Sequence, residues 1–352
     1  MRSIRNQASL FAFLPVLAIA LSFGSTVQAQ NRTTAPATKQ SATHKKNSTS
    51  PAKASARKTA AKNTTARKSK VVNRQNLRTA SHSANMRPDT LDNAVEPLTP
   101  QAMLRSEVAF VQDLQNSDVL YDKNSDEVRP IASISKLMTA LVVAEAGLPM
   151  DEILEIADED VDRMRYSRSR LRVGTKLKRS DMLHLALMSS ENRAAHALGR
   201  YYPGGMPAFV RAMNDKARSL GMRRTRFVEP TGLSVENVST PRDLVKLLRA
   251  TSNHPLIHRY TTDDKYEINV GKGRQLVYNN TNRLVKNDDW DIKISKTGFI
   301  NEAGECLVML TRIDGRDVAI ILLNSTGRYS RIGDAVRIRT LVENAASNVA
   351  ML

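Results

Sequence analysis

Hydrophobic spacing changes twice along the last two thirds of the chain, and it predicts strands, then helices, then strands again. Apolar residues from Val108 to Leu114, a polar turn and a second apolar run over 119–121 predict a β-hairpin. From Ser133 to Ala146 nearly every residue is apolar, which is typical of a helix that is buried on all sides. Further helical segments are expected over 181–188, 193–201, 207–220 and 241–251.

After these helices the apolar positions return to a period of two. This spacing predicts strands over 275–279, 291–297, 306–313 and 318–324. Asp314 and Gly315 suit a turn between the last two strands, and a closing helix is expected over 330–346. Strands on both sides of a helical middle predict an α/β fold of the α+β type, with an antiparallel sheet in which the first hairpin meets the last three strands.

The first 29 residues are expected to be a signal peptide. Two arginines precede an apolar run over 10–23, and Val27-Gln28-Ala29 is the small-residue pattern after which such peptides are cleaved. The run is short and contains Pro15, which argues against a membrane span, and no later run has the length that a membrane helix needs. Export through a bacterial inner membrane is therefore predicted, with an uncleaved anchor as the alternative.

Residues 30–97 are expected to form a basic disordered linker. Up to about Pro88 they are mainly Ala, Thr, Ser, Asn, Lys and Arg, so they bury too little apolar surface to offset the entropy cost of ordering. The folded domain is then expected to span 98–346, followed by a short tail over 347–352.

The formal net charge of +18 is concentrated in this N-terminal arm. Residues 1–88 contain 16 Lys and Arg and no Asp or Glu, which leaves 37 of the 53 basic and all 35 acidic residues in 89–352, a net charge of +2. Nucleic-acid binding is not expected, because the excess charge lies outside the folded domain of an exported protein. The arm is either a solvated linker or a source of weak electrostatic contact with anionic wall or membrane polymers.

Cysteine and histidine usage predicts no disulfide, no metal site and no cofactor. The one cysteine, Cys306, lies in an apolar run and is expected to be a small buried hydrophobe. His184 and His196 lack a second ligand at metal-binding spacing, so both are expected to be packed or surface helix residues.

Three Ser-x-x-Lys strings occur, and only one is held by a rigid element. Two lie in the arm, whereas Ser133 opens the buried helix and Lys136 follows one turn later. Residues three apart share a helix face, so the lysine can reach the serine hydroxyl. A buried unpaired ammonium is costly, which favours loss of its proton and would make the lysine a base for the hydroxyl. The alternative is that Ser133 only caps the helix while Lys136 extends to solvent.

Ser190-Glu191-Asn192 lies between two expected helices. A second hydroxyl beside the catalytic lysine can pass a proton to a leaving amine, and the Asn192 amide can hold a substrate carbonyl. The alternative interpretation is ordinary helix capping by these short polar side chains.

Lys296-Thr297-Gly298 ends the strand expected over 291–297. Gly298 lets a substrate backbone approach closely, Thr297 offers a hydroxyl to a carboxylate, and Lys296 supplies a positive charge. An edge strand can also bind an extended peptide by strand addition. The alternative is a turn that follows an edge strand and carries a solvated lysine.

The order and spacing of the three motifs resemble those of the penicillin-binding protein and serine β-lactamase family. Over 107–343 the chain is similar to the soluble D-alanyl-D-alanine endopeptidases among the low-molecular-mass penicillin-binding proteins. This similarity is carried by the runs 129–140, 187–195, 226–234 and 296–299. It implies a β-lactamase/transpeptidase-like fold, with a five-stranded antiparallel sheet flanked by helices, a helical lobe, and the site between them.

Position by position, the resemblance implies catalytic roles for Ser133 as the acylated nucleophile, Lys136 as its base and Ser190 as a proton shuttle. The reaction would be attack on a D-alanyl peptide bond, formation of an acyl-enzyme and hydrolysis of that ester.

The resemblance also implies a set of substrate-binding residues. Asn192 would bind a substrate amide, and Lys296 and Thr297, followed by Gly298, would bind the terminal carboxylate. The backbone N–H groups of the nucleophile and of Phe299 would bind the oxyanion.

These roles predict a soluble periplasmic endopeptidase that acts on D-alanyl cross-links between peptidoglycan peptide stems, with β-lactam antibiotics as acylating inhibitors. The alternatives are D,D-carboxypeptidase action on pentapeptide ends, β-lactamase activity, and a catalytically idle wall-binding module. The chain ends just after the last expected helix, without the membrane-anchoring extension of the carboxypeptidase relatives, which favours a soluble enzyme.

Overall fold

The computed structural model describes the backbone of residues 104–350 and the side chains of residues 104–344. The expected signal peptide (1–29) and basic linker (30–97) lie outside the described residues, as do residues 98–103 and 351–352. No helix in the described part of the chain is both long and apolar enough to cross a membrane.

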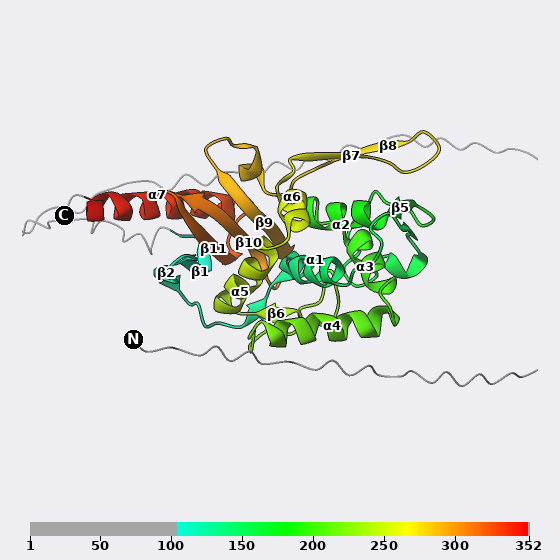
Figure 1. Cartoon of the computed structure of the whole chain (residues 1–352), viewed down its shortest axis with the longest axis horizontal. Helices are drawn as coiled ribbons and strands as arrows, with labels where there is room; N and C mark the ends of the chain where they lie inside the picture. Colours follow the sequence, from blue (N-terminus) through cyan, green and yellow to red (C-terminus); the bar gives the residue numbers. More distant parts are fainter. Residues whose placement is uncertain (1–103, 351–352) are drawn as a thin grey trace, which may run out of the picture. The chain divides into compact units, whose positions relative to one another are not determined.

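A five-stranded antiparallel sheet forms one side of the domain (Figure 1). Its strands are β1 (Ser106–Asp113), β2 (Val119–Lys123), β9 (Asp291–Ile300), β10 (Gly304–Ile313) and β11 (Arg316–Ser325). The spatial order is β2-β1-β11-β10-β9, so the first hairpin meets the last three strands as predicted, and β9 lies at an edge.

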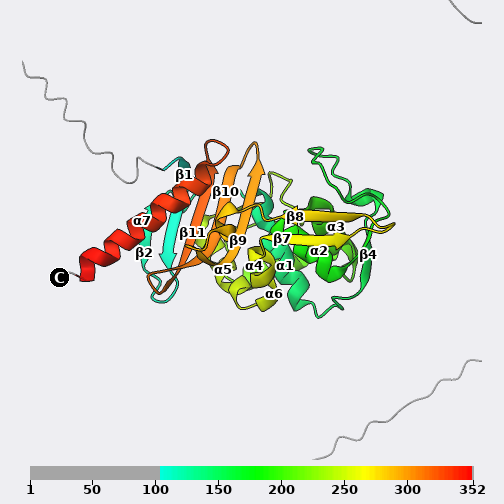
Figure 2. The same cartoon turned by 90° about the horizontal axis from the view of Figure 1, so that it is seen from above.

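Successive residues of the sheet bury two separate hydrophobic clusters. Val308 and Leu310 of β10 belong to the cluster shared with the helical lobe, whereas Leu307 and Met309 belong to the cluster that includes α7 (Ser330–Ala350). Figure 2 shows α7 lying across one face of the sheet. Because neighbouring strand residues point to opposite faces, a sheet covered on both faces needs the continuous apolar runs seen in β10 and β11.

The other face of the sheet carries a helical lobe arranged around α1. Its elements are η1 (Ala132–Ile134), α1 (Ser135–Glu145), η2 (Asp158–Asp160), α2 (Arg179–Met188), α3 (Asn192–Arg200), α4 (Gly205–Ser219), α5 (Pro241–Ser252) and α6 (Pro255–Thr262). Helix α1 contacts α2, α3, α4, α5 and α6, and its Leu137, Met138 and Leu141 are fully buried. The predicted all-apolar helix is thus confirmed, and its first turn is a 3-10 helix that contains Ser133.

Three two-stranded sheets and η3 (Arg283–Lys286) complete the described domain. The pairs are β3 (Arg129–Pro130) with β6 (Val238–Ser239), β4 (Ile153–Glu155) with β5 (Lys176–Lys178), and β7 (Lys265–Asn269) with β8 (Gln275–Asn279). Of these strands only β8 was predicted. Strand β7 alternates Tyr266 and Ile268 with the charged Lys265 and Glu267, which leaves too short an apolar pattern to detect.

Strand β9 continues beyond its predicted end. Gly298 pairs with Cys306 and Ile300 pairs with Gly304, so the expectation that the strand stops at Thr297 was wrong. Lys296-Thr297-Gly298 therefore lies inside an edge strand and not in a turn. Cys306 is fully buried as predicted, and this burial raises the pKa of its thiol to about 11.

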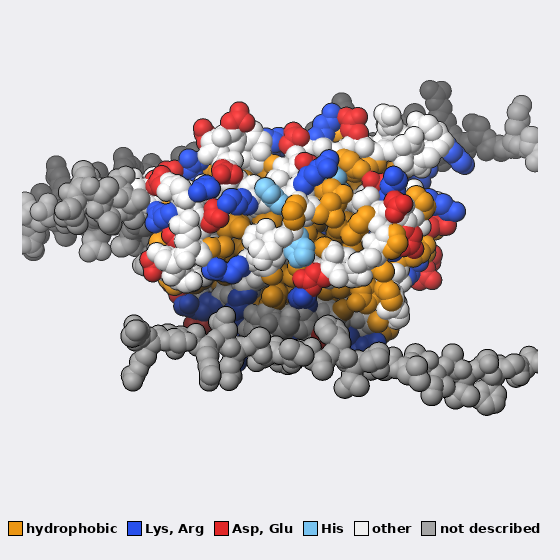
Figure 3. Space-filling view, in the orientation of Figure 1, with side chains coloured by type: hydrophobic (Ala, Val, Ile, Leu, Met, Phe, Trp, Pro, Cys, Tyr) orange, Lys and Arg blue, Asp and Glu red, His pale blue; other side chains and the backbone are white. Residues whose placement is uncertain are grey.

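The surface of the domain carries charges of both signs. On the face seen in Figure 3, Lys and Arg side chains are interspersed with Asp and Glu side chains around the rim. This mixture agrees with the net charge of +2 counted for residues 89–352. The closing helix α7 runs past its expected end at residue 346, so the expected tail begins as helix.

Candidate active site

Ser133 and Lys136 lie side by side at the start of the central helix. Ser133 lies in η1, and Lys136 follows in the first turn of α1. The Lys136 Nζ donates a hydrogen bond to the Ser133 Oγ at 2.8 Å. The Lys136 side chain is 0% exposed, so the alternative in which it extends to solvent is wrong.

The ammonium of Lys136 is surrounded by three acceptors. Besides Ser133 it donates to the Asn192 Oδ1 at 2.7 Å and to the Thr231 carbonyl oxygen at 2.6 Å. Burial lowers the pKa of Lys136 to about 8, against the opposing effect of the Glu229 and Glu191 carboxylates. The lowered pKa makes the neutral form of this lysine, which can accept a proton, more accessible than in an exposed lysine.

Ser190 lies in the short connection between α2 and α3, with a left-handed φ of +63°. Its Oγ accepts a hydrogen bond from the Lys296 Nζ at 3.0 Å. The sequence suggested that this hydroxyl would lie beside Lys136, and in the structure its hydrogen-bonded lysine is Lys296. Positive φ is costly for a serine, so the surrounding structure holds this loop in a fixed position.

Lys296 and Thr297 lie on edge strand β9, which borders the site. Lys296 is 1% exposed and also donates to the Thr297 carbonyl oxygen at 2.8 Å. Burial, together with the positive charges of Lys136 and Arg331, lowers the pKa of Lys296 well below its usual value. The Thr297 Oγ1 donates to the Thr281 Oγ1 at 2.7 Å. A carboxylate bound at this strand edge would favour the protonated form of Lys296 and pair with it.

Two glycines let other segments approach the nucleophile closely. A Cβ at Gly298 would lie 3.1 Å from the Ser133 nitrogen and equally close to the Ile131 carbonyl oxygen. Gly232 has a φ of +81°, and a Cβ there would lie 1.8 Å from the Ala132 carbonyl oxygen. Gly298 was expected to make room for a substrate, and the structure adds that it makes room for the nucleophile's own backbone.

A hydrogen-bonded loop over 229–237 supports the catalytic lysine. This loop lies outside the three motifs, and its role was not predicted from the sequence. The Glu229 carboxylate accepts from the backbone N–H groups of Thr231 and Gly232, both at 2.6 Å. The fully buried Asn237 donates through Nδ2 to the Ser135 Oγ at 3.0 Å and to the Glu229 carbonyl oxygen at 2.8 Å. This network fixes the Thr231 carbonyl that binds Lys136. In the sequence, this loop could have been noticed from the string Glu229-Pro230-Thr231-Gly232.

Two further residues outside the motifs position motif residues. The Asn192 Nδ2 donates to the Ser167 Oγ at 2.9 Å, so both ends of this amide are engaged. Arg331, in the first turn of α7, donates through Nη1 to the Gly298 carbonyl oxygen at 2.9 Å and pairs with Glu305. Ser167 and Arg331 belong to none of the three motifs, so the sequence did not indicate that they position motif residues.

His184 and His196, the two histidines considered in the sequence, each contact a neighbouring side chain. His184 is buried and stacks on Tyr260, with ring centroids 4.3 Å apart and planes 7° apart. The His196 Nδ1 lies 2.7 Å from the Asp160 Oδ1, and Arg200 donates to the same carboxylate. Both arrangements agree with the expectation of packed helix residues.

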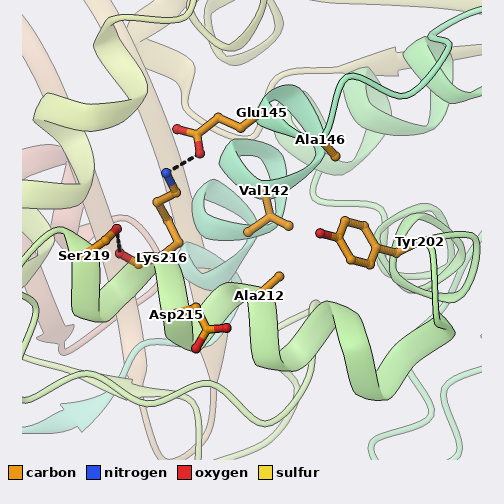
Figure 4. A pocket seen from close by; sticks show the side chains of 8 residues that line it. All are labelled: Val142, Glu145, Ala146, Tyr202, Ala212, Asp215, Lys216 and Ser219. Atoms are coloured by element: carbon orange, nitrogen blue, oxygen red, sulfur yellow. Dashed lines mark hydrogen bonds and ion pairs between the residues drawn. The ribbon is translucent and has the colours of Figure 1, made fainter. Parts of the chain in front are cut away.

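A hollow of about 240 Å³ opens beside the catalytic lysine and is lined in part by Asn192, Glu229 and Thr231. A second hollow lies between α1 and α4 and is lined by Val142, Ala212 and the Glu145–Lys216 ion pair among others (Figure 4). Of the motif residues, Asn192 lines the first hollow and none lines the second, so the first hollow borders the site while the second is separate from it.

Comparison with known proteins agrees with this geometry. Residues 94–327 match the profile of the D-alanyl-D-alanine carboxypeptidase family of peptidases. This chain belongs to that family. It is 50% identical over 244 residues to the D-alanyl-D-alanine endopeptidase of Escherichia coli, and 51% identical over 244 residues to that of Pseudomonas aeruginosa, covering 69% of this chain and 79% of each relative.

Solved structures of the same family share the fold. The Streptomyces K15 DD-transpeptidase superposes with a TM-score of 0.63 at 28% identity, over 68% of this chain and 97% of that one. Penicillin-binding protein D2 from Listeria monocytogenes, solved with ampicillin bound, gives a TM-score of 0.58 at 32% identity, over the same shares of the two chains. The predicted penicillin-binding fold, an antiparallel five-stranded sheet with a helical lobe, is thus confirmed.

Proposed function

We propose that this chain is a serine D,D-endopeptidase that hydrolyses D-alanyl cross-links in peptidoglycan through an acyl-enzyme on Ser133. The observation that carries the chemistry is the buried Lys136 Nζ at 2.8 Å from the Ser133 Oγ. The choice of bond rests on the relatives named D-alanyl-D-alanine endopeptidase, which are 50% and 51% identical to this chain.

Acylation begins when neutral Lys136 accepts the proton of the Ser133 hydroxyl. The Oγ attacks the D-alanyl carbonyl carbon, and the oxyanion is bound by the backbone N–H groups of Ser133 and Phe299. The carbon–nitrogen bond then breaks, and the proton held by Lys136 passes to the leaving amine through the Ser190 hydroxyl, which Lys296 holds in the free enzyme. The products of this half-reaction are a free amine and an ester on Ser133.

Deacylation uses the same groups in reverse. Lys136 accepts a proton from a water molecule that attacks the ester carbonyl, and it returns this proton to the Ser133 oxygen as the ester breaks. Asn192 binds an amide of the peptide stem, and Lys296 with Thr297, beside Gly298, binds the carboxylate next to the scissile bond. β-Lactam antibiotics would acylate the same serine.

The second candidate is D,D-carboxypeptidase action on pentapeptide ends. A relative named D-alanyl-D-alanine carboxypeptidase in Bacillus subtilis is 31% identical over 226 residues, and the matching family carries that name. Purified muropeptide dimers and pentapeptide monomers, digested side by side, separate the two activities. We expect the dimers to be cut to monomers, and release of D-alanine alone would overturn the endopeptidase assignment.

β-Lactamase action is less well supported. A fast lactamase of one major class needs a glutamate that holds a deacylating water, and Glu229 is the residue in the corresponding interval. Its carboxylate is instead engaged by the N–H groups of Thr231 and Gly232. We expect a long-lived adduct on Ser133, measured as a mass increase of the intact protein. A protein that binds cell wall but never gains this mass would be the catalytically idle module.

We further propose that residues 1–29 direct export to the periplasm and that residues 30–97 form a linker ahead of the catalytic domain at 98–346. Sequencing of the mature N-terminus should give Gln30. The basic arm would add only a weak electrostatic contact with anionic wall or membrane polymers, and salt would weaken it.

A further inference from the structure

An open groove on the helical lobe is lined by basic side chains. Residues 172–176 form one wall, and Val270, Gly271, Lys272 and Arg274 at the tip of the β7–β8 hairpin form the other. The groove has a volume of about 570 Å³, and four of its nine lining residues are Lys or Arg while none is Asp or Glu. Figure 3 shows basic side chains at this end of the molecule, where Figure 1 places β5 and the hairpin. We call this feature the basic groove.

The cations of the basic groove are largely unpaired. Lys176 pairs with Glu155 at 3.3 Å, and the two side chains are 64% and 46% exposed. Within the described residues, Arg172, Lys272 and Arg274 form no ion pair. Because residues 89–352 carry a net charge of only +2, this is a local concentration of charge. A groove with one sign of charge raises the local concentration of anions.

Specific contacts hold the groove walls together in spite of like-charge repulsion. The Arg170 guanidinium lies over the Tyr278 ring, 3.8 Å from its centroid, and Tyr278 is 3% exposed. The Arg274 Nη2 donates to the Arg170 carbonyl oxygen at 3.3 Å. Stacking on an aromatic ring and a bond to the backbone fix the hairpin against the loop that carries Arg172.

The same loop continues into the wall of the active site. Ser167 accepts from the Asn192 amide, and the Arg193 Nη1 donates to the Leu171 carbonyl oxygen at 2.7 Å. Arg172 comes directly after Leu171. It lies five positions after Ser167, so at most about 18 Å of chain separates the hydrogen-bond partner of Asn192 from the groove. A substrate that extends a few residues beyond the scissile bond can reach both.

We infer that the basic groove binds the free carboxylates of a neighbouring peptide stem in the same peptidoglycan, so that the enzyme acts better on the polymer than on small fragments. This inference rests on the proposed function. Every D-alanyl stem that is not cross-linked ends in a carboxylate, so the polymer offers many such anions near each cross-link. Hydrated arginine and lysine side chains bind carboxylates weakly one at a time, and several together give a usable attraction.

The test compares two triple variants of the full chain that remove the same charge. Arg172→Gln, Lys272→Gln and Arg274→Gln neutralise the groove. Arg211→Gln, Arg223→Gln and Arg249→Gln neutralise three exposed cations elsewhere that form no ion pair in the described domain. Because the N-terminal arm is the same in both proteins, it cannot cause a difference between them, and equal activity on a soluble dimer shows that loss of the Arg274 bond to Arg170 leaves the active site intact.

The first readout is hydrolysis of intact sacculi and of a soluble muropeptide dimer. We expect the groove triple to lose about five- to ten-fold in kcat/KM on sacculi, through KM, and to match the control triple on the dimer. The difference should vanish in about 0.5 M NaCl, because salt screens exposed charges. Equal activity of the two triples on sacculi at low salt would overturn the inference.

The second readout measures binding without cleavage. With Ser133→Ala added to both triples, sedimentation with sacculi should show weaker binding of the groove triple. This difference would stand even if no cross-link were cut, which separates it from failure of the proposed function. Vesicles that contain anionic phospholipid are the competing ligand. Loss of vesicle binding with sacculus binding unchanged would assign the groove to a membrane surface and overturn the inference.

Discussion

Two groups of basic side chains in this domain differ because one is buried and the other is hydrated. Lys136 and Lys296 are 0% and 1% exposed, and burial lowers the pKa of both. Arg172 and Lys272 instead line an open groove. In the interior the effective dielectric constant is low, so a charge there interacts strongly with its neighbours and changes its protonation. On the surface, water and salt screen such a charge, so its attraction to an anion is weak.

Basic side chains therefore serve two purposes in this domain: proton transfer where they are buried and attraction of anions where they are hydrated. Each buried lysine is held by at least two hydrogen bonds between 2.6 and 3.0 Å, so its position is fixed to a fraction of an ångström. Such placement is what proton transfer requires. The groove cations need no fixed position, because attraction to a polymer with many carboxylates tolerates side-chain motion.

The strongest test of the buried group is Lys136→Met, which keeps the apolar stem and removes the amine. Without a base, acylation of Ser133 by a β-lactam should slow by about 10³-fold or more. The measurement is the rate at which intact protein gains the mass of the adduct. Circular dichroism checks that the variant is folded. A folded variant that acylates at the wild-type rate would show that Lys136 is not the base.

The pH dependence of acylation probes the same lysine without a mutation. The working form is the neutral amine, and the pKa of Lys136 is lowered to about 8, so the neutral form dominates above that pH and declines below it. The acylation rate should therefore fall about ten-fold per pH unit below about 8. Because Lys296 is close enough to interact, the observed midpoint belongs to the pair.

Glu229→Gln sharpens the pH experiment. The Glu229 carboxylate raises the pKa of Lys136, so its removal should move the midpoint to lower pH. The single amide oxygen can replace only one of the two carboxylate oxygens that accept from Thr231 and Gly232, so circular dichroism has to show that the variant is folded. Stopped-flow acylation across the pH range measures the shift. A wild-type profile that is flat from about pH 6 to 9 would contradict the assignment of Lys136 as the base.

A smaller effect is expected for Asn237→Ala, which removes support from the catalytic lysine. Asn237 bonds to Ser135, to the Glu229 carbonyl oxygen and to the Val228 N–H. Leaving these buried groups without partners should cost about 1–3 kcal/mol of unfolding free energy, measured with urea. Acylation should also slow, by about ten-fold, because the Thr231 carbonyl loses its fixed position.

Asn214→Ala is the matched control for Asn237→Ala. Asn214 also bonds to backbone groups, at Val210 and at both the N–H and the carbonyl of Phe227, away from the three motifs. It should lower stability by a similar amount and leave acylation unchanged. If both variants slow acylation equally, the effect of Asn237 is general destabilisation and not positioning.

Much of this fold was predictable because the spacing of apolar residues within an element indicates whether it is a helix or a strand. The nearly continuous apolar run over 133–146 indicated a buried helix, and the period-two runs near the C-terminus indicated strands. Helix α6 and strand β7 escaped prediction because each is short and depends on tertiary contacts, such as Tyr260 stacked on His184. Local patterns do not record such contacts.

Within the site, the sequence predicted the contacts between residues that lie a few positions apart in one motif. The contact between Ser133 and Lys136 follows from helix geometry alone. The contact between Ser190 and Lys296 joins residues that are 106 positions apart and could not be placed from spacing. Asn237 and Arg331 were missed for the same reason, since each acts through one long-range bond to a motif segment.

The smallest effect is expected at a lysine that is neither buried nor catalytic. Lys216 pairs with Glu145 across the hollow between α1 and α4, and the two side chains are 26% and 35% exposed (Figure 4). Partly hydrated pairs of this kind contribute about 0–1 kcal/mol, so Lys216→Met should change the urea midpoint little and acylation not at all. The same substitution at Lys136 should slow acylation by about 10³-fold or more. Similar losses from the two variants would mean that burial does not distinguish the catalytic lysine, and the comparison between buried and hydrated charge would fail.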